Sequence, residues 1–556
     1  MKEKSTLKDV ANNYLTHTRK NNGITLVALV VTIIILLILA GITISSLTNT
    51  GLFGRAKEAR DKTAAAAENQ AKILNEYEDE LNKYISWNTK KLQADGSWND
   101  SKKVNSPQLM EGMTGIYWDK DGNEIEVTAD NQDNWYDYDK QEWANAITKD
   151  SDGNITGYWV WIPRYAYKIE SGRYTSTAGK ISVKFLQGTS NKDENNAEIS
   201  QNYPETTGET MSAYVVHPSF TDGSENGKNN HYMNGEWDKE IAGYWVAKYA
   251  AGFQECTQTV ANDGTVTEPT TNLANVKYSD KNYTKNTYSI NAISQTLTAL
   301  PKMSYPVFKP LTYAYNVIST GDAYILSQQI AKARNFYGLN STKTDSHQMK
   351  NSEWGAVVYL TQSSYGRDRE KVTINSKSFK NANSKNIWAI TGYAENTANG
   401  IKASSTNNKN GIFDLSGCVV EYTAAYISNG NENISNYGKS YASTTANSNG
   451  YLTLSTKYAT VYPYSDSNDS YSGNYNMYLD KKTTTYGFGD AILETSNSGA
   501  DLTSWNEQSS WFLRTGNTFF QRGGKFDKGS AGIFNFVSYQ GCAIWDGGFR
   551  SVLVAQ

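Results

Sequence analysis

The sequence contains few of the residues that cross-link a chain or keep it unfolded. Of its 556 residues, 9 are proline, 3 are cysteine (Cys256, Cys418 and Cys542) and 4 are histidine. So few prolines, in a chain rich in aromatic residues, argue against disorder. Three cysteines are too few for a disulfide scaffold and cannot all pair. Four histidines argue against a histidine-rich metal enzyme.

Neither sign of charge is in excess. Lys and Arg number 53 against 56 Asp and Glu, which gives a formal net charge of -3. This balance argues against a general nucleic-acid binder, which needs a basic surface to displace counterions. Aromatic side chains, by contrast, make up 12% of the residues. The length suits two to four domains or one large domain with appendages, and the composition predicts a folded, extracellular chain.

Familiar catalytic motifs are also missing. The sequence has no His-Glu-x-x-His, no Gly-x-Ser-x-Gly and no phosphate loop with Gly-Lys-Ser/Thr. His217, His231 and His347 are isolated, which is typical of surface or hydrogen-bonded core residues, and capping of a helix near Glu353 would explain His347. Acidic residues are plentiful, but the sequence does not show which of them pair in space. We therefore predict no enzyme, no catalytic residue, no metal and no cofactor.

The longest apolar run lies near the N-terminus. Ile24–Leu47 carries no charge, and a helix of that length rises about 36 Å, enough to span a bilayer. The preceding residues are net basic, which favours a cytoplasmic N-terminus and an extracellular C-terminal domain. The segment therefore predicts a single-pass membrane protein, and a plain signal anchor is the simplest interpretation.

The junction before this run carries a further signal. Lys20-Asn-Asn-Gly23-Ile24 resembles the cleavage site of type IV prepilins. That resemblance implies cleavage between Gly23 and Ile24 by a prepilin peptidase, methylation of the new N-terminus and assembly with other pilin subunits. The family's usual Glu at the fifth mature position is replaced by Ala28 here. The replacement implies a minor or tip subunit, or a protein that stays anchored without assembling.

A helix is expected to follow the apolar run. Arg55 to about Ile85 is rich in Ala, Glu and Lys and lacks Gly and Pro. An apolar stripe recurs at helical spacing in Leu74, Tyr77, Leu81 and Tyr84. The pattern favours a pilin-like extension of the membrane helix, with a stalk or short coiled coil as the alternative.

Beyond Trp87 the sequence is typical of strands joined by polar loops. Asp-Gly pairs at Asp121, Asp152 and Asp222 predict turns. Two similar aromatic segments, Gly157–Lys168 and Gly243–Ala250, predict buried strands of one domain. A stretch from 371 to 480 dense in Asn, Ser, Thr and Tyr predicts insertion loops, a usual place for binding residues.

Four short motifs then follow in a recognisable order. They resemble motifs of the formylglycine-generating-enzyme, or sulfatase-modifying-factor, family. Lys350–Tyr359 resembles the helix of that family, and Asn410–Tyr422 resembles its Asn-Gly-Leu-Tyr-Asp strand. Trp511–Gly516 resembles its Arg-Gly-Gly strand, and Gly548-Phe-Arg550 resembles its closing Gly-Phe-Arg. The resemblance implies a C-type lectin fold from about Tyr158, with a final strand from Ser551 to Ala555.

The family's chemistry is incompletely matched. Its enzymes bind copper through two cysteines before Gly-Phe-Arg, and this chain has only Cys542 in that interval. Cys418 stands where the family usually has Asn, which puts a calcium site there in doubt, and Glu421 is expected to be a buried, satisfied carboxylate. A formylglycine-type oxidase is therefore the least favoured function.

The last fifty residues resemble a second branch of this fold, the variable proteins of diversity-generating retroelements. Arg522–Phe536 looks like that branch's Gly-rich approach, and Val537–Arg550 looks like its diversified segment. The resemblance implies a ligand-binding face at the C-terminus. The candidate ligand-binding residues are Thr515, Asn517, Phe519, Phe520, Ser538, Tyr539, Gln540, Cys542, Ile544, Trp545 and Asp546.

Aromatic residues near the C-terminus are expected to divide between core and surface. Phe512, Phe534, Phe536 and Phe549 are predicted to be core. Trp511, Phe519, Phe520, Tyr539 and Trp545 cluster in this region, and of these Tyr539 and Trp545 lie in a Gly-rich loop and are predicted to be exposed. Rigid aromatics among adaptable polar neighbours suit a recognition surface.

Together these patterns predict an α+β fold, a long N-terminal pilin-like α-helix followed by a β-rich C-type-lectin-like domain. The predicted divisions are a leader over 1–23, a transmembrane helix over 24–47, its extension over 48–86, a β-rich connecting region over 87–156 and the lectin-like domain over 157–556. The predicted function is a bacterial cell-surface or pilus-associated adhesin or receptor for an unknown glycan or protein. The alternatives are a structural minor pilin without its own ligand and the oxidase.

Overall fold

The computed structural model describes residues 104–556 apart from several segments, together with helical residues between 60 and 73. The segments outside the description are 224–234, 258, 261–265, 268–304, 317, 381–386, 394, 439–456, 482–487, 498–501 and 530. Contacts divide the chain into two units, Met1–Ile85 and Ser86–Gln556. In the first unit the described residues are helical and exposed, in agreement with a helix there. The apolar stripe from Leu74 to Tyr84 lies outside the described residues.

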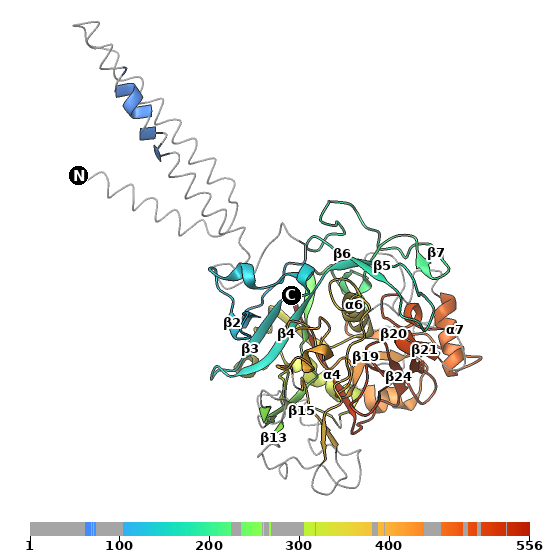
Figure 1. Cartoon of the computed structure of the whole chain (residues 1–556). Coiled ribbons are helices and arrows are strands. Elements are labelled where there is room, and N and C mark those ends of the chain that lie inside the picture. Colours follow the sequence, from blue (N-terminus) through green and yellow to red (C-terminus); the bar gives the residue numbers. More distant parts are fainter. Residues whose placement is uncertain are drawn as a thin grey trace, which may run out of the picture. The chain divides into compact units, whose positions relative to one another are not determined.

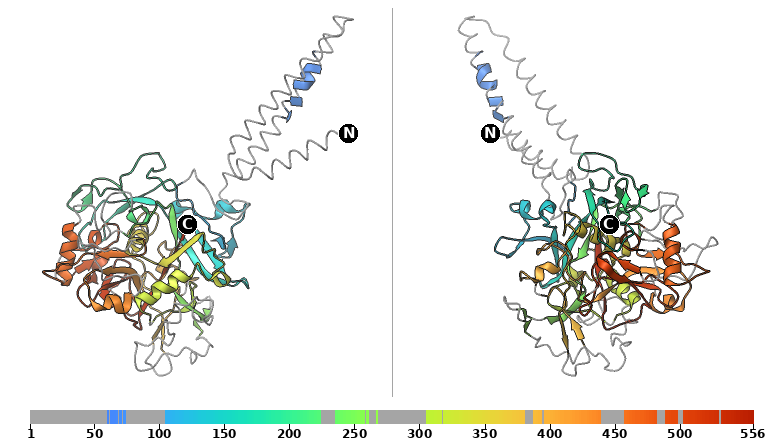
Figure 2. Two further views of the ribbon diagram at one scale, coloured as in Figure 1. Left: turned by 180° about the vertical axis from the view of Figure 1, so that it is seen from behind. Right: turned by 45° about the vertical axis from the view of Figure 1, so that its right-hand side comes forward.

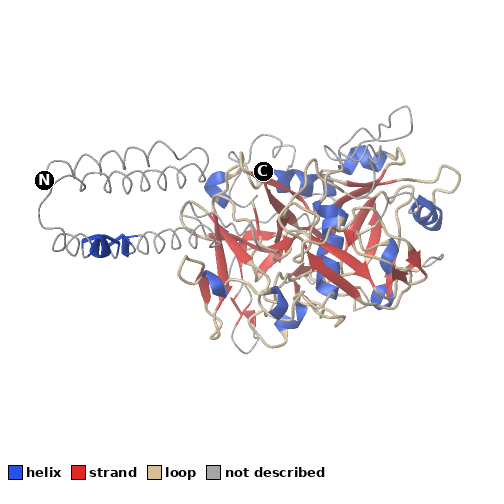
Figure 3. Ribbon diagram, turned by 90° about the horizontal axis from the view of Figure 1, so that it is seen from above, coloured by secondary structure: helices blue, strands red, loops and turns tan. Residues whose placement is uncertain are grey.

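The predicted fold class is wrong. The described residues are β-rich with few helices (Figure 3). No helix among the described residues is long and apolar enough to cross a membrane. That finding contradicts the single-pass membrane location and the pilin-like assignment, which both rested on the apolar run. The run itself, Ile24–Leu47, and the cleavage site at Gly23 lie outside the described residues.

The largest sheet has seven antiparallel strands in the order β16-β26-β10-β4-β3-β1-β2. Its strands are β1 (Met113–Trp118), β2 (Glu124–Glu126), β3 (Asn145–Lys149), β4 (Ile155–Pro163), β10 (Gly243–Ala247), β16 (Thr344–Gln348) and β26 (Ser551–Ala555). The two similar aromatic segments supply β4 and β10, which pair directly with Trp161 opposite Trp245. The prediction that they are strands of one domain is confirmed. Because β1, β2 and β3 join the same sheet, the predicted connecting region belongs to this domain.

Tight turns join the strands at one edge of this sheet, in blue-green in Figure 1. Between β1 and β2, the Asp119 carboxylate accepts the backbone N–H groups of Asp121 and Asn123, both at 2.9 Å. Between β3 and β4, the Asp150 carboxylate plays the same part. Gly153 has a φ of +85°, which is unstrained only for glycine. The turns predicted at Asp121 and Asp152 are confirmed.

A helix buried on every side crosses the core. All twelve residues of α6 (Asn351–Gln362) are buried, as expected for a helix that is enclosed by protein rather than lying on its surface. Its first turn is closed by the Glu353 carboxylate, which accepts the Lys350 backbone N–H at 2.8 Å. The helix predicted at Lys350–Tyr359 is confirmed. The other helices of this unit are α4 (Thr320–Gln329), α5 (Arg334–Tyr337) and α7 (Tyr471–Lys481).

Gly355 allows α6 to pack against a neighbouring backbone. A Cβ at this position would lie 1.9 Å from the Gly489 carbonyl oxygen. We therefore expect Gly355→Ala to destabilise the fold by about 1–3 kcal/mol through overpacking, although alanine is the better helix former. Chemical denaturation followed by tryptophan fluorescence measures the change. Gly153→Ala is a useful comparison because nothing lies near its Cβ and only its positive φ resists the substitution.

A second sheet has the order β20-β19-β23-β24, with β25 also paired to β19. Its strands are β19 (Val420–Ile427), β20 (Thr460–Tyr462), β23 (Phe519–Arg522), β24 (Phe536–Tyr539) and β25 (Gly547–Phe549). The pairs of β19 with β20 and with β25 are parallel, and the others are antiparallel. In both views of Figure 2 the red C-terminal strands lie beside the orange segment that includes α7.

The predictions for the C-terminal part of the chain are confirmed in part. The final strand predicted from Ser551 to Ala555 is β26. A strand predicted at Trp511–Gly516 is wrong, because Arg514 and Asn517 exchange backbone hydrogen bonds and turn the chain at Thr515-Gly516. The strand that pairs with β19 begins two residues later and ends at Arg522, just before Gly523 and Gly524.

Smaller sheets complete the unit. Three-stranded sheets have the orders β6-β5-β9 and β14-β11-β15, and pairs are formed by β7-β8, β12-β13, β17-β18 and β21-β22. The bounds are β5 (Tyr165–Ile169), β6 (Ile181–Phe185), β7 (Thr206–Thr207), β8 (Thr210–Met211), β9 (Val215–Val216), β11 (Gly252–Thr257), β12 (Thr259–Val260), β13 (Val266–Thr267), β14 (Pro306–Val307), β15 (Thr312–Ala314), β17 (Ser378–Lys380), β18 (Ile387–Ala389), β21 (Leu502–Ser504) and β22 (Gln508–Ser510). The predicted insertion stretch at 371–480 thus contains β17 to β20 and part of α7.

Candidate functional site

The candidate binding residues gather at one end of the β23-β24 pair. The two strands are antiparallel, and Phe519 at the start of β23 lies opposite Tyr539 at the end of β24. The turn at Thr515–Asn517 therefore meets the loop that begins at Gln540. Asn433, next to the short helix at Ile434–Gly438, donates a hydrogen bond of 2.8 Å to the Gly516 carbonyl. We call Thr515, Asn517, Tyr539, Gln540, Cys542, Ile544 and Trp545 the C-terminal face.

Buried residues contact the backbone of the loop from Gln540 to Asp546 and fix its position. Gly541, with a φ of +92°, leaves no room for a Cβ, which would lie 2.4 Å from the Phe519 ring. The Tyr422 hydroxyl donates to the Cys542 carbonyl at 2.7 Å. The Asn316 amide donates to the Trp545 carbonyl. The loop backbone is therefore fixed while several of its side chains reach the surface.

An ion pair and an aromatic contact fix Trp545. Lys525 Nζ lies 2.5 Å from the Asp546 carboxylate and 4.8 Å from the centre of the Trp545 ring. Phe526 packs edge-on against the same indole with ring centres 5.7 Å apart. Burial lowers the pKa of Lys525, but the hydrogen bonds and charges of Asp546 and Asp527 together outweigh it, so the pKa lies above its ordinary value. Lys525 thus stays charged beside the indole at neutral pH.

The eleven predicted binding residues differ widely in exposure. Thr515 and Gln540 are exposed, and Asn517, Tyr539, Cys542, Ile544 and Trp545 are half-buried. Ser538 and Asp546 are buried, with 6% and 8% of their surface exposed. Phe519 and Phe520 are fully buried and offer no surface to a ligand.

Register explains why these two phenylalanines are buried. Phe520 packs against Phe512 and Phe536 in one cluster, and Phe519 packs against Tyr426 on the other side of the strand. Neighbouring residues point to opposite faces of a strand, and a separate apolar cluster covers each face of β23. The core prediction for Phe512, Phe534, Phe536 and Phe549 is confirmed, since all four are fully buried.

Some residues beside this face were not predicted. Asp469 accepts the Thr515 backbone N–H at 3.0 Å, and the Tyr471 hydroxyl accepts from Asn517 at 2.9 Å. The Arg514 guanidinium lies 4.2 Å above the Tyr471 ring. Asp469 and Tyr471 fall in the stretch predicted as insertion loops, but nothing in the sequence pairs them with residues 514–517. Trp511 is 45% exposed and is the only exposed large hydrophobic side chain described after residue 104.

A buried ion pair joins the closing Gly-Phe-Arg motif to the second sheet. Arg550 donates to both oxygens of Glu421, at 2.6 and 3.0 Å, and to the Ala247 and Phe413 carbonyls. Neither residue is accessible to solvent beyond 1%. Burial raises the pKa of Glu421, and Arg550 opposes that rise. The prediction that Glu421 is a buried, satisfied carboxylate is confirmed.

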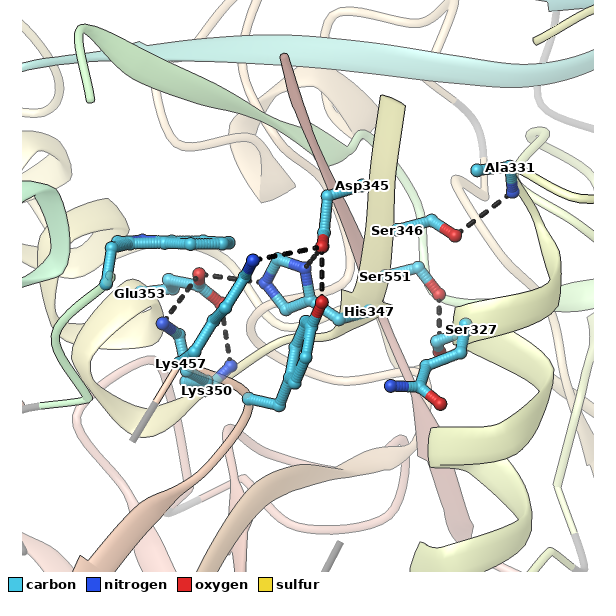
Figure 4. Close-up of polar contacts among 12 residues, drawn as sticks. Ser327, Ala331, Asp345, Ser346, His347, Lys350, Glu353, Lys457 and Ser551 are labelled. Atoms are coloured by element: carbon cyan, nitrogen blue, oxygen red, sulfur yellow. Dashed lines mark hydrogen bonds and ion pairs between the residues drawn. The ribbon is translucent and has the colours of Figure 1, made fainter. Parts of the chain in front are cut away.

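A second charged network lies under the edge of the large sheet (Figure 4). His347, on β16, has one ring nitrogen 2.9 Å from the Asp345 carboxylate and the other 2.9 Å from the Glu353 carboxylate. The Lys350 ammonium lies 3.5 Å from Glu353 and donates to the Gly235 carbonyl. The Tyr458 hydroxyl donates to Asp345 at 2.6 Å. The network ties β16 to the start of α6, so His347 does not act as the helix cap that we predicted.

The pKa values in this network favour the charged forms of its carboxylates and histidine. Burial lowers the pKa of His347, but Glu353 and Asp345 outweigh it, so the pKa lies above its ordinary value. Burial raises the pKa of Asp345, yet the hydrogen bond and charge of His347, together with Tyr458 and Lys457, bring it down to about 2. With carboxylates on both ring nitrogens, the histidine is a structural cation and has no free nitrogen for proton transfer.

No family model matches this sequence, and no curated protein matches it significantly.

In the part of the chain that is described, the side chains form neither a metal-binding site nor a reactive thiol site. No group of three His, Cys, Asp or Glu side chains there could hold a metal ion. Cys418 is buried and Cys542 half-buried, and both are free thiols. Burial raises the pKa of each thiol, which opposes thiolate formation. The side chain of Cys256 lies outside the described residues.

Proposed function

We propose that this protein binds a macromolecular ligand, a glycan or a protein, through its C-terminal face. The observation that carries the proposal is the contrast between backbone and side chains in the loop after β24. The backbone is fixed by Tyr422, Asn316 and the Gly541 contact. The side chains of Tyr539, Gln540 and Trp545 remain wholly or partly accessible. Rigid aromatics with an adaptable amide beside them suit recognition, since little conformational entropy is lost on binding.

The similarity to retroelement variable proteins supports the same interpretation. Its segment Val537–Arg550 spans this loop together with most of β24 and all of β25. Substitutions at the half-exposed positions of the loop would leave the buried strand β25 and the Arg550–Glu421 pair in place. A loop of this kind can change its ligand without changing its fold.

Binding assays on the full chain test the proposal. We expect the wild-type chain to retain a ligand from immobilised glycans or from a panel of cell-surface proteins. Tyr539→Ala and Gln540→Ala should each raise the Kd by at least about 10-fold, because accessible residues at the centre of an interface carry most of its energy. Tyr117→Ala, which removes a half-buried tyrosine from β1 on the other sheet, is the matched control.

The outcomes separate the alternatives. Retention that is lost in both face variants but not in Tyr117→Ala supports the C-terminal face. Equal retention by all variants would move the binding site elsewhere. Retention of nothing by the wild-type chain would favour a structural domain without its own ligand.

A further inference from the structure

A lysine and an asparagine meet in the core of the seven-stranded sheet, far from the C-terminal face. Lys248 directly follows β10, and Asn145 begins β3. Both side chains are fully buried. The Lys248 Nζ lies 2.8 Å from the Asn145 side-chain oxygen. Strand β4 lies between their strands, with Val160 opposite Asn145 on one side and Val246 on the other.

The charge of Lys248 is compensated only in part, by aromatic rings, hydrogen-bond acceptors and the more distant carboxylates of Glu395 and Glu124. Its Nζ lies 4.6 Å from the centre of the Trp118 ring and 5.6 Å from that of Phe413. It also donates to the Lys409 carbonyl. Among the residues that the structure describes, no carboxylate forms an ion pair with it. A buried ammonium without such a partner is costly, so conversion to an uncharged group would relieve the cost.

The Asn145 amide is oriented by the backbone. Its Nδ2 donates to the Trp143 and Asn410 carbonyls, both at 2.8 Å. These bonds hold the amide with its oxygen toward Lys248, so the carbonyl carbon lies one bond beyond the atom that Lys248 contacts. An amine held at hydrogen-bond distance from an amide oxygen, in a site closed to water, needs only a small movement to reach that carbon.

An acid for proton transfer lies nearby. Glu395 acts electrostatically on Lys248, and the Tyr249 hydroxyl donates to its carboxylate. Burial raises the pKa of Glu395 to about 7, and burial lowers the pKa of Lys248 to about 7. These opposite shifts bring the two pKa values together, so a neutral Lys248 amine is accessible at neutral pH.

We propose that Lys248 and Asn145 react within the folded chain to form an intramolecular amide cross-link. The Glu395 carboxylate takes a proton from the Lys248 ammonium, and the neutral Nζ attacks the Asn145 Cγ. The Nζ–Cγ bond forms, the second amine proton passes through Glu395 to Nδ2, and the Cγ–Nδ2 bond breaks. Ammonia leaves and takes the first proton from Glu395 to become ammonium, so Glu395 ends ionised as it began. No oxidant, reductant or cofactor is needed.

The cross-link would join β3 to β10 across β4. It would close the intervening chain, which includes β5 to β9, into a covalent loop and so restrict the unfolded chain. A bond of this kind resists denaturant and reducing agents because it is neither a disulfide nor an ion pair. It would also resist pulling forces on the strands that it joins.

Mass spectrometry of the purified full-length chain tests the proposal. We expect an intact mass lower than the sequence mass by one ammonia for each chain, and a protease digest containing the Lys248 peptide joined to the Asn145 peptide. Lys350 is an internal control, since it is equally buried but donates to the Gly235 carbonyl rather than to a side-chain amide. Its peptide should be recovered unlinked.

Three variants separate the chemistry from folding. Lys248→Arg and Asn145→Ala should each have the full sequence mass. Glu395→Gln can still accept the Tyr249 hydrogen bond, and we expect it to form the link at least about 100-fold more slowly after refolding. Circular dichroism confirms that each variant is folded.

The proposal has clear points of failure. A folded wild-type chain with its full sequence mass and unlinked peptides would overturn it, and Lys248 would then be a buried cation held by hydrogen bonds alone. Cross-linking at the wild-type rate in Glu395→Gln would overturn the role given to that residue.

Discussion

Arg550→Met is expected to destabilise the folded chain by about 3–5 kcal/mol, because it leaves the Glu421 carboxylate buried without its counter-charge. Arg550 donates to both Glu421 oxygens and to two backbone carbonyls, and the substitution removes all four hydrogen bonds. Denaturant unfolding followed by tryptophan fluorescence gives the change in the free energy of unfolding.

The loss should depend on pH. Burial already raises the pKa of Glu421, and removal of Arg550 raises it further. A carboxyl whose folded pKa is raised adds stability below its unfolded pKa and loses it as the pH rises through the folded value. The difference in the free energy of unfolding between wild type and Arg550→Met should therefore be smallest at acidic pH and largest at alkaline pH.

Two comparisons isolate the pair. Adding Glu421→Leu to Arg550→Met should restore much of the stability, because no buried charge is then left alone. Arg334→Met removes an exposed arginine that pairs with Glu111, and it should change little. A double variant no more stable than the single one would show that Arg550 matters chiefly through its carbonyl contacts.

His347→Ala should have a comparable effect, about 3–5 kcal/mol, because it leaves two buried carboxylates facing each other. Asp345 and Glu353 both bind the imidazole, and the remaining cation bound to Glu353 is Lys350. Denaturant unfolding at a series of pH values measures the difference between wild type and variant.

The pH dependence identifies the cause. The folded pKa of His347 is raised, so its contribution is fully present below its unfolded value of about 6.5 and is lost as the pH rises through the folded value. The pKa of Asp345 is lowered to about 2, so its contribution is lost only as the pH falls toward that value. The difference in the free energy of unfolding between wild type and His347→Ala should be largest from about pH 4 to 6.5.

His217 supplies the opposite control. It is also buried, but it faces the Ser219 hydroxyl instead of a carboxylate, and burial lowers its pKa to about 3. Its neutral form is the one that fits the fold. The difference in the free energy of unfolding between wild type and His217→Gln should therefore become smaller as the pH falls from about 6.5 toward 3. Parallel pH profiles for the two histidines would contradict the charged state assigned to His347.

Local patterns in the sequence were enough to locate many elements of the domain. Asp-Gly pairs marked the turns at Gly122 and Gly153, and the aromatic segments marked β4 and β10, whereas the helix α6 was expected from the family resemblance. Each of these features depends on a few neighbouring residues, because turn geometry, strand alternation and helix capping are local. The same local reading of an apolar run led to a membrane helix that the described chain does not contain.

The tertiary structure decided which residues meet and which are covered. Phe519 and Phe520 resemble loop aromatics in sequence, yet β23 is an inner strand and both are buried. Three pairs of side chains come together from separate elements: Glu421 with Arg550, His347 with Glu353, and Lys248 with Asn145. Sequence alone determined the turns at Asp121 and Asp152, the strands β4 and β10 and four of the core phenylalanines of this protein, whereas the remaining burial and the charge pairing followed from strand order, because contacts across a sheet depend on register between segments far apart in the chain.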